Sequence, residues 1–301
     1  MRKPSPAFIL IITATIIWGA TAPIMKLTLT EVPIFSLGFI RQLVAAIIFF
    51  PFVARDLKIE KADIKPLVIA TLLGTNINLF FFFSGLKLTQ AINASILVSA
   101  VPIFTLLAAH LYLKEKLTAK LVLSSATALL GALIIIGMPI MASDFKSVLG
   151  NIFLMAATIS FVAYEIIAKK LLKKYSAAKL TFYMFVIAAI VFLPNSIVEL
   201  TTNPSWFTKV DLSGILGLLY GIIFASALAS YLWQKGLSLI PAGEAALFFY
   251  IDPISGIIVS MILLGEKLTT SFTLGAILIV IGVYLAEHHR KNHILHQRHV
   301  N

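Results

Sequence analysis

The sequence predicts an all-α membrane protein of ten transmembrane helices, arranged as two inverted five-helix repeats with both termini in the cytoplasm. Three observations support this prediction. Hydrophobic residues make up 59% of the 301-residue chain and charged residues only 12%, whereas about a quarter of the residues of a soluble domain are charged. Long apolar segments alternate with short polar links, and parts of the first half recur in the second.

The apolar segments predict the helices, because a spanning helix needs about 20 predominantly apolar residues. No segment is long enough for a separate soluble domain. The first segment contains Trp18 and Pro23 and lacks a small-residue cleavage site, which favours a retained helix over a cleaved signal peptide. The ten segments are residues 7–25, 33–54, 67–86, 91–112, 118–138, 149–168, 179–198, 212–233, 241–264 and 270–287.

Lys and Arg set the predicted orientation, because cytoplasmic loops are enriched in these residues. With the N-terminus inside, the basic stretches 55–65 and 169–179 are cytoplasmic, and the outer loops carry single lysines. This bias predicts a multi-pass protein of the plasma (inner) membrane. The net charge of +11 does not indicate nucleic acid as a partner, because the basic residues form short clusters rather than one stripe.

An internal repeat divides the chain, because short motifs of the first half recur in the second at one constant offset of 151 residues. These motifs are Gly85-Leu86 and Gly236-Leu237, Pro102-Ile103 and Pro253-Ile254, and the sequence Glu-Lys-Leu-Thr at 115–118 and at 266–269. In the first two helices, Trp18 and Lys26 match Phe161 and Lys169 at a slightly shorter offset. The longer loop at 201–211 accounts for the difference.

Each half holds five helices, an odd number, so the second half enters the membrane in the opposite orientation. The predicted units are a first repeat, 1–142, a second and inverted repeat, 143–287, and a basic His-rich cytoplasmic tail, 288–301. Inverted repeats are typical of transporters, whose substrate site lies near the membrane midplane between the halves. Duplication for stability alone is the alternative interpretation.

The order and spacing of these motifs resemble the EamA family of the drug/metabolite transporter (DMT) superfamily. The resemblance rests on Ile17-Trp18-Gly19, the two proline-containing helices and the two Glu-Lys-Leu-Thr motifs, and it covers essentially the whole chain. It implies a carrier of amino acids, related metabolites or amphipathic drugs, often an exporter. It also implies that the first, third and fourth helices of each half line the cavity. Phe161 stands where the repeat has Trp18, which implies weaker aromatic stacking at that wall.

Polar and aromatic residues at helical spacing mark a candidate substrate cavity, since such a surface suits an amphipathic solute. Small hydroxyl-bearing residues also mediate helix packing, so packing is the alternative interpretation for the Ser and Thr residues. The candidate cavity residues are Trp18, Thr21, Thr75, Asn78, Phe82, Asn93, Tyr164, Ser226, Ser230, Trp233, Phe248 and Asp252.

Ionisable residues inside membrane helices are costly to bury and commonly functional. Asp252, which directly precedes Pro253, is a candidate for binding a substrate amine or carrying a proton, and Glu244 and Glu165 are further candidates for proton or charge coupling. The alternatives are an ion pair within the bundle for Asp252, solvation at the membrane surface for Glu244, and a helical i,i+4 pair with Lys169 for Glu165.

Three further features favour structural roles. Arg41, within the second segment, is expected to form a structural ion pair, with snorkelling toward the outer surface as the alternative. The segments 118–138 and 270–287 lack ionisable residues in their cores and carry small residues at heptad spacing, which allows close helix approach. We interpret these two helices as scaffold or as the faces of a homodimer.

Several function classes lack their signatures in this sequence. It contains no cysteine, no phosphate-binding loop, no paired-histidine zinc motif and no nucleophile elbow, so we expect no enzyme activity, no metal site and no cofactor. The sequence instead predicts a secondary transporter of small metabolites, amino acids or related amphipathic solutes, which works by alternating access as an exporter or exchanger. Its expected partners are a small-molecule substrate and the lipid bilayer. A multidrug efflux carrier and a non-transporting structural membrane protein are the alternatives.

Overall fold

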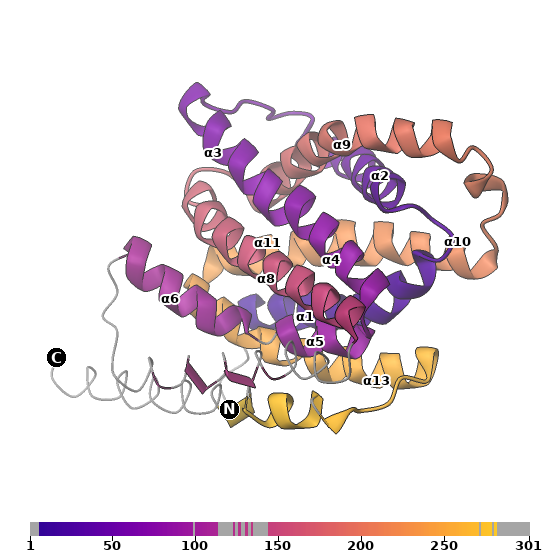
Figure 1. The fold of residues 1–301 in the computed structure, drawn as a ribbon. Helices are drawn as coiled ribbons and strands as arrows, with labels where there is room; N and C mark the ends of the chain where they lie inside the picture. The colour runs from indigo at the N-terminus through magenta and orange to yellow at the C-terminus, as the bar shows by residue number, and fades with distance from the viewer. Residues whose placement is uncertain are drawn as a thin grey trace, which may run out of the picture.

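The computed structural model describes residues 6–98, 100–113, 144–270, 272–278 and 280–281, together with positions 123, 126–127, 130–131 and 134. Within these residues all regular elements are helices, packed into one bundle (Figure 1). They are α1 (Pro6–Thr28), α2 (Ile34–Val53), α3 (Lys61–Thr71), the π-helical η1 (Leu72–Ile77), α4 (Asn78–Leu88), α5 (Ala91–Val98), α6 (Val101–Leu113), α8 (Phe145–Leu171), α9 (Ala177–Thr202), the 3₁₀-helical η2 (Trp206–Thr208), α10 (Leu212–Leu219), the π-helical η3 (Tyr220–Leu228), α11 (Ala229–Leu239), α12 (Ala242–Ala246), the 3₁₀-helical η4 (Leu247–Tyr250) and α13 (Asp252–Leu264).

Seven helical stretches of the described chain are long and apolar enough to cross a membrane, and a shorter apolar helix covers Phe248–Leu264. They correspond to the first four and the sixth to ninth predicted segments. The predicted segment 118–138 and the tail 288–301 lie largely or wholly outside the described residues, and 270–287 is described only in part. The count of ten helices, the position of the termini and the homodimer therefore stay predictions.

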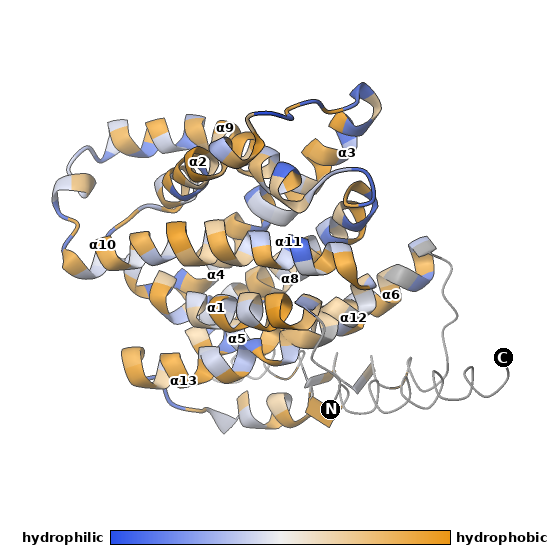
Figure 2. Cartoon of the chain, turned by 180° about the vertical axis from the view of Figure 1, so that it is seen from behind, coloured by the Kyte–Doolittle hydropathy of each residue, from blue (hydrophilic) through white to orange (hydrophobic). Residues whose placement is uncertain are grey.

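The outer surface of the bundle is apolar, as Figure 2 shows for the helices, whereas hydrophilic residues gather in loops such as the one before α3. Large hydrophobic side chains are left uncovered, with Phe52 75% and Ile262 80% exposed. Water-soluble monomers rarely expose large continuous apolar areas, so this surface suits contact with lipid chains. The helices thus present the exterior of a multi-pass membrane protein.

The two halves of the chain are interleaved, because the third helix of each half packs on the first helix of the other half: α4 on α8, and α11 on α1. Glycines allow both close approaches. A Cβ atom added to Gly85 would lie 2.9 Å from the carbonyl oxygen of Gly150, and one added to Gly236 would lie 3.4 Å from that of Ala7. Since these residues occupy equivalent positions of the repeat, the same contact occurs twice.

The second helices of the halves complete the interleaving, since α2 packs along α9 at one edge of the bundle while α13 lies at the opposite edge (Figure 1). Each of these second helices contains an internal proline at the equivalent position, Pro51 in α2 and Pro194 in α9. The buried hydrophobic residues form three clusters, and each of them contains residues from both halves of the chain.

Two of the predicted spans, 91–112 and 241–264, differ from single regular helices. The first consists of α5, which ends at Val98, and α6, which begins at Val101; the second passes through a 3₁₀ turn before α13 begins at Asp252. Pro102 and Pro253 each take the second position of the new helix. A proline there breaks no intrahelical hydrogen bond, which explains why each helix restarts just before its proline.

The third helices of both halves change to π geometry near their middles, at Leu72–Ile77 and at Tyr220–Leu228. The two π segments coincide under the repeat. Neither was expected, because regular apolar periodicity gives no sign of a local change in helical pitch. Such turns are uncommon and frequently occur at functional sites, so they direct attention to the centre of the bundle.

Candidate functional site

A cavity of about 150 Å³ lies between the two halves. An apolar protein cavity of this volume accommodates a benzene-sized molecule. Both halves supply its walls, including both π segments, and the lining residues are Trp18, Thr21, Ala22, Arg41, Gln42, Gly74, Thr75, Asn78, Leu79, Phe82, Ala94, Ser95, Val98, Val101, Leu154, Ala157, Thr158, Phe161, Phe185, Ala225, Ser226, Ser230, Phe249 and Asp252.

The structure brings most of the sequence-predicted cavity residues to this one cavity. Four others lie outside its lining: Asn93, Tyr164, Trp233 and Phe248. Contact with a substrate stays a prediction for the whole set. Those that line the cavity are Trp18, Thr21, Thr75, Asn78, Phe82, Ser226, Ser230 and Asp252.

Side chains satisfy backbone carbonyl groups in both π segments beside the cavity. The Trp18 indole donates from Nε1 to the Ala225 carbonyl in η3 at 3.0 Å, and the Ser160 hydroxyl donates to the Leu73 carbonyl in η1 at 2.6 Å. These hydrogen bonds tie the first helix of each half to the π segment of the other half. The irregular backbone is therefore held in place on both sides of the cavity.

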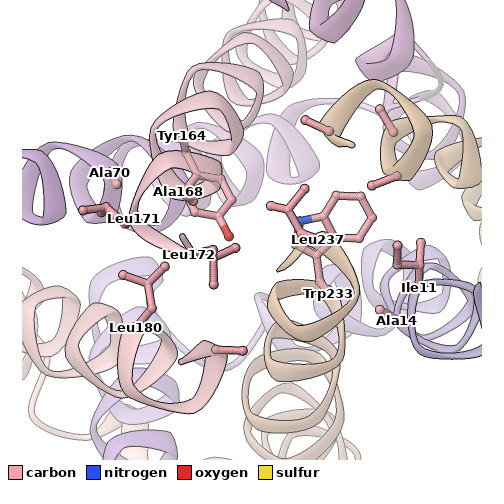
Figure 3. Close-up of a cluster of buried hydrophobic side chains, with 14 of the residues drawn as sticks. Ile11, Ala14, Ala70, Tyr164, Ala168, Leu171, Leu172, Leu180, Trp233 and Leu237 are labelled. Atoms are coloured by element: carbon pink, nitrogen blue, oxygen red, sulfur yellow. The ribbon is translucent and has the colours of Figure 1, made fainter. Parts of the chain in front are cut away.

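An aromatic cluster forms part of the cavity wall. Trp18 contacts Phe161 edge-on at 5.8 Å between ring centroids, and Trp233 contacts Phe249 at 4.7 Å. Tyr164 packs against Phe161 at 5.2 Å, and it lies with Trp233 among buried aliphatic side chains of α8 and α11 (Figure 3). Trp233 and Tyr164 thus support the rings that face the cavity, and Phe248 packs separately against Phe8.

Asp252 is a buried carboxyl group at the cavity wall, only 4% exposed. It is the first residue of α13, where the positive end of the helix dipole favours a negative charge. No described residue donates a hydrogen bond to its side chain or forms an ion pair with it. The alternative expectation of an ion-pair partner within the bundle is therefore not met in the described part of the chain.

Arg41 contradicts the expectation of a structural ion pair. Its side chain is buried and lines the cavity, and its Nε atom donates to the Gly221 carbonyl at 3.1 Å and to the Ser226 hydroxyl at 3.2 Å. Among the described residues no carboxylate lies within ion-pair distance of it. The second helix was not expected to line the cavity, although the adjacent polar pair Arg41 and Gln42 in an apolar segment was a usable signal.

The other two candidates for charge coupling lie elsewhere. Glu165 is fully buried outside the cavity lining, where the Thr105 hydroxyl donates to it at 2.9 Å. The predicted helical pair with Lys169 is wrong, because Lys169 donates to the backbone carbonyls of Leu237, in the last turn of α11, and of Ile240, at 2.6 Å. Glu244 belongs to α12, and its side chain lies outside what the structure describes.

A polar cluster joins three elements at the end of the bundle that we call the Lys26 end. Lys26 donates to the Thr89 carbonyl at 2.7 Å and to Glu266 at 2.9 Å. Glu266 also accepts from the backbone N–H groups of Ala91 and Ile92, at 2.9 Å each, so it caps the start of α5. Asn93 belongs to this end as well, since its amide donates to the Thr89 hydroxyl.

The opposite end, which we call the Lys169 end, repeats part of this arrangement. Lys169 bonds the Ile240 carbonyl just as Lys26 bonds the Thr89 carbonyl, and both the lysines and the carbonyls are repeat-equivalent. The nearby loops also meet in ion pairs. Lys179 donates to Asp56 at 2.7 Å, and this hydrogen bond holds the pKa of the Asp56 carboxyl below its ordinary value.

Comparisons with known proteins agree with this architecture. The sequence profile of the EamA-like transporter family matches residues 5–137 and again residues 148–287. The uncharacterized transporter YetK of Bacillus subtilis (strain 168) is 24% identical over 292 residues, covering 95% of this chain and 88% of that protein. An uncharacterized transporter of Archaeoglobus fulgidus is 25% identical over 285 residues, covering 93% of this chain and 97% of that protein.

A solved structure, described only as the crystal structure of a protein, shares the fold. It superimposes with a TM-score of 0.68 at 18% sequence identity, covering 94% of this chain and 98% of that chain. The family resemblance drawn from the sequence motifs is confirmed by the profile match over both halves. The chain therefore belongs to the EamA-like transporter family.

Proposed function

We propose that this protein is a secondary transporter of small metabolites, amino acids or related amphipathic solutes, and that it works by alternating access as an exporter or exchanger. The observation that carries the proposal is the cavity between the interleaved halves, which combines aromatic walls with the buried carboxyl group of Asp252. Its volume of about 150 Å³ suits a solute of small-metabolite size.

The two ends of the bundle support the alternating mechanism. Lys26 and Lys169 are equivalent under the repeat, and each bonds the carbonyl that leads into the fourth helix of a half. Contacts of the same kind at both ends provide two gates that open in turn, as the halves of inverted-repeat carriers do. The rings of Trp18 and Phe161, which contact each other edge-on, both line the cavity.

We place ten helices in the plasma membrane, with both termini and the Lys169 end in the cytoplasm. The support is the enrichment of basic residues at that end, where Lys174 of the loop at 172–176 pairs with Glu60 of the loop at 54–60. Under this orientation the Lys26 end faces outward.

Counterflow in liposomes tests the proposal. Purified protein is reconstituted into vesicles preloaded with unlabelled solute, and uptake of labelled amino acids and metabolites is measured one at a time. We expect protein-dependent counterflow of at least one member of the panel. Folded protein that moves none of them would count against the proposal.

Asp252→Asn tests the coupling role in the same vesicles. We expect this variant to lose the dependence of flux on a pH gradient, because an amide cannot take up and release a proton. Asp144→Asn is the matched control, since Asp144 caps α8 and Asn is an equally good cap. Unchanged pH dependence in Asp252→Asn would remove Asp252 as the proton carrier.

Multidrug efflux is the second candidate, favoured by the aromatic rings of Trp18, Phe82, Phe161 and Phe249 at the cavity. A cationic dye such as ethidium distinguishes the two in the same vesicles. Dye transport without counterflow of any metabolite would favour the efflux function.

A further inference from the structure

Arg41 carries a buried charge whose hydrogen-bonding capacity is only partly used. A guanidinium group has five N–H donors. Nε bonds the Gly221 carbonyl and the Ser226 hydroxyl, and Nη1 has only the Met25 sulfur at 3.6 Å. Nη2 has no acceptor among the described residues, although the Arg41 side chain lines the cavity and the residue is 3% exposed. Unused donors of a cation therefore remain beside the cavity.

The same cavity holds a buried carboxyl group that is also without a partner in the described chain. Asp252 lines it, and within the described chain it neither accepts a side-chain hydrogen bond nor forms an ion pair. Arg41 and Asp252 do not pair with each other. Since a charged group inside a membrane is costly unless it is paired or hydrated, the two groups call for a partner that enters the cavity.

The repeat shows that packing alone does not require these charges. The position equivalent to Arg41 in the second half is Met184, in the apolar core, and the position equivalent to Asp252 in the first half is Val101, an apolar residue that also lines the cavity. The same places in the fold are thus filled by apolar side chains where no ligand group is needed. Each charge occurs once, on one half only.

The neighbours of Arg41 fix the Nε edge of its guanidinium group and leave the Nη edge for a ligand. It lies 5.4 Å from the centre of the Phe83 ring, within cation–π distance. Gly221 and Ser226 hold the Nε edge, so the Nη groups are the ones left for a ligand. A planar guanidinium matches the two oxygens of a carboxylate.

We propose that Arg41 forms an anion subsite that binds the carboxylate group of the transported solute, while Asp252 receives its cationic or N–H-bearing group. This proposal rests on the transport function proposed above and narrows its substrates to small solutes that carry a carboxylate. It disfavours purely cationic drugs, because these would place a second positive charge beside Arg41.

Binding of matched aromatic probes tests the subsite. Benzoate fits a benzene-sized cavity and carries a carboxylate, and benzamide has nearly the same shape without the charge. Binding to purified protein in nanodiscs is followed by isothermal titration and by the change in total tryptophan fluorescence, to which Trp18 at the cavity contributes. We expect benzoate to bind at least about tenfold more tightly than benzamide, as charge-assisted hydrogen bonds imply.

Substitution of Arg41 decides the source of that preference. Arg41→Gln is expected to abolish the preference, and Arg41→Lys to retain part of it, since lysine keeps the charge without the planar fork. Arg55→Gln, on the exposed loop after α2, is the control that keeps the full preference. If Arg41→Gln does not yield folded protein, the reduced preference of Arg41→Lys carries the test.

The subsite is rejected if benzoate and benzamide bind equally to the wild-type protein, or if the folded Arg41 variants keep the full preference for benzoate. It is also rejected if phosphate at equal concentration displaces benzoate, because that result would indicate a general site for inorganic anions. The subsite and the transport function fail separately. Arg41-dependent benzoate binding without counterflow in vesicles would support the subsite and reject the transport function. Counterflow without any preference for carboxylates would support the transport function and reject the subsite.

Discussion

In the first half of the chain Arg41 lines the cavity, whereas the equivalent position of the second half is Met184 in the apolar core. In the second half Asp252 lines the cavity, and its counterpart is Val101. The glycine contacts between the halves, by contrast, are the same on both sides. The repeat therefore preserves the packing between helices, whereas only the first half supplies Arg41 to the cavity and only the second half supplies Asp252.

The strongest test of the shared packing is a large side chain at the repeated glycines. We expect Gly85→Leu and Gly236→Leu to prevent folding to similar extents, because each side chain would meet backbone or packed side chains of the other half, and such overpacking costs about 1–3 kcal/mol or more. Fluorescence-detected gel filtration measures the yield of monodisperse protein.

Gly243→Ala serves as the control for these variants, because among the described residues an added Cβ there meets Leu106 alone, at the ordinary contact distance of 3.4 Å. A normal yield for one repeated glycine and none for the other would show that the two contacts are not equivalent.

Substitutions of Glu266 at the Lys26 end and of Lys169 at the opposite end compare how much the polar contacts at each end stabilise the bundle. Glu266→Gln is expected to destabilise the protein by about 2 kcal/mol, since it weakens charge-assisted hydrogen bonds to Lys26 and to the start of α5. Lys169→Gln is expected to cost less, about 1 kcal/mol, because Lys169 bonds backbone carbonyls. Thermal unfolding in one detergent ranks the two variants, and the reverse order would contradict this account of the ends.

Arg41→Met, which copies the second half, is expected to have the smallest effect on stability. An apolar side chain at this place removes the cost of burying a charge that lacks an ionic partner. We therefore expect an unchanged or higher unfolding temperature together with loss of the carboxylate preference. A marked loss of stability would show that Arg41 serves the packing of α2.

The helices and their repeat could be read from the sequence because lipid demands long apolar segments and the duplicated motifs kept their spacing. The cavity lining from the first, third and fourth helices also followed from spacing and resemblance, as Trp18 and Asn78 illustrate. These properties depend on local composition and on order along the chain.

The partners of the buried charges could not be predicted in the same way. Arg41 bonds Gly221 in η3, and Glu165 accepts from Thr105 in α6, so each partner comes from a distant helix. Helical spacing suggested the nearer Lys169 for Glu165, but Lys169 reaches backbone carbonyls instead. Such choices depend on the interleaving of the halves, which no single segment encodes.

The interleaved packing has a consequence for synthesis in the cell. The face of α4 that carries Gly85 is covered by α8, which begins at Phe145. This face therefore has no partner during synthesis until α8 has left the ribosome. The early helices must wait in the bilayer, or beside the insertion machinery, until the later ones arrive. Assembly is therefore a late step, in which both halves acquire their final partners together.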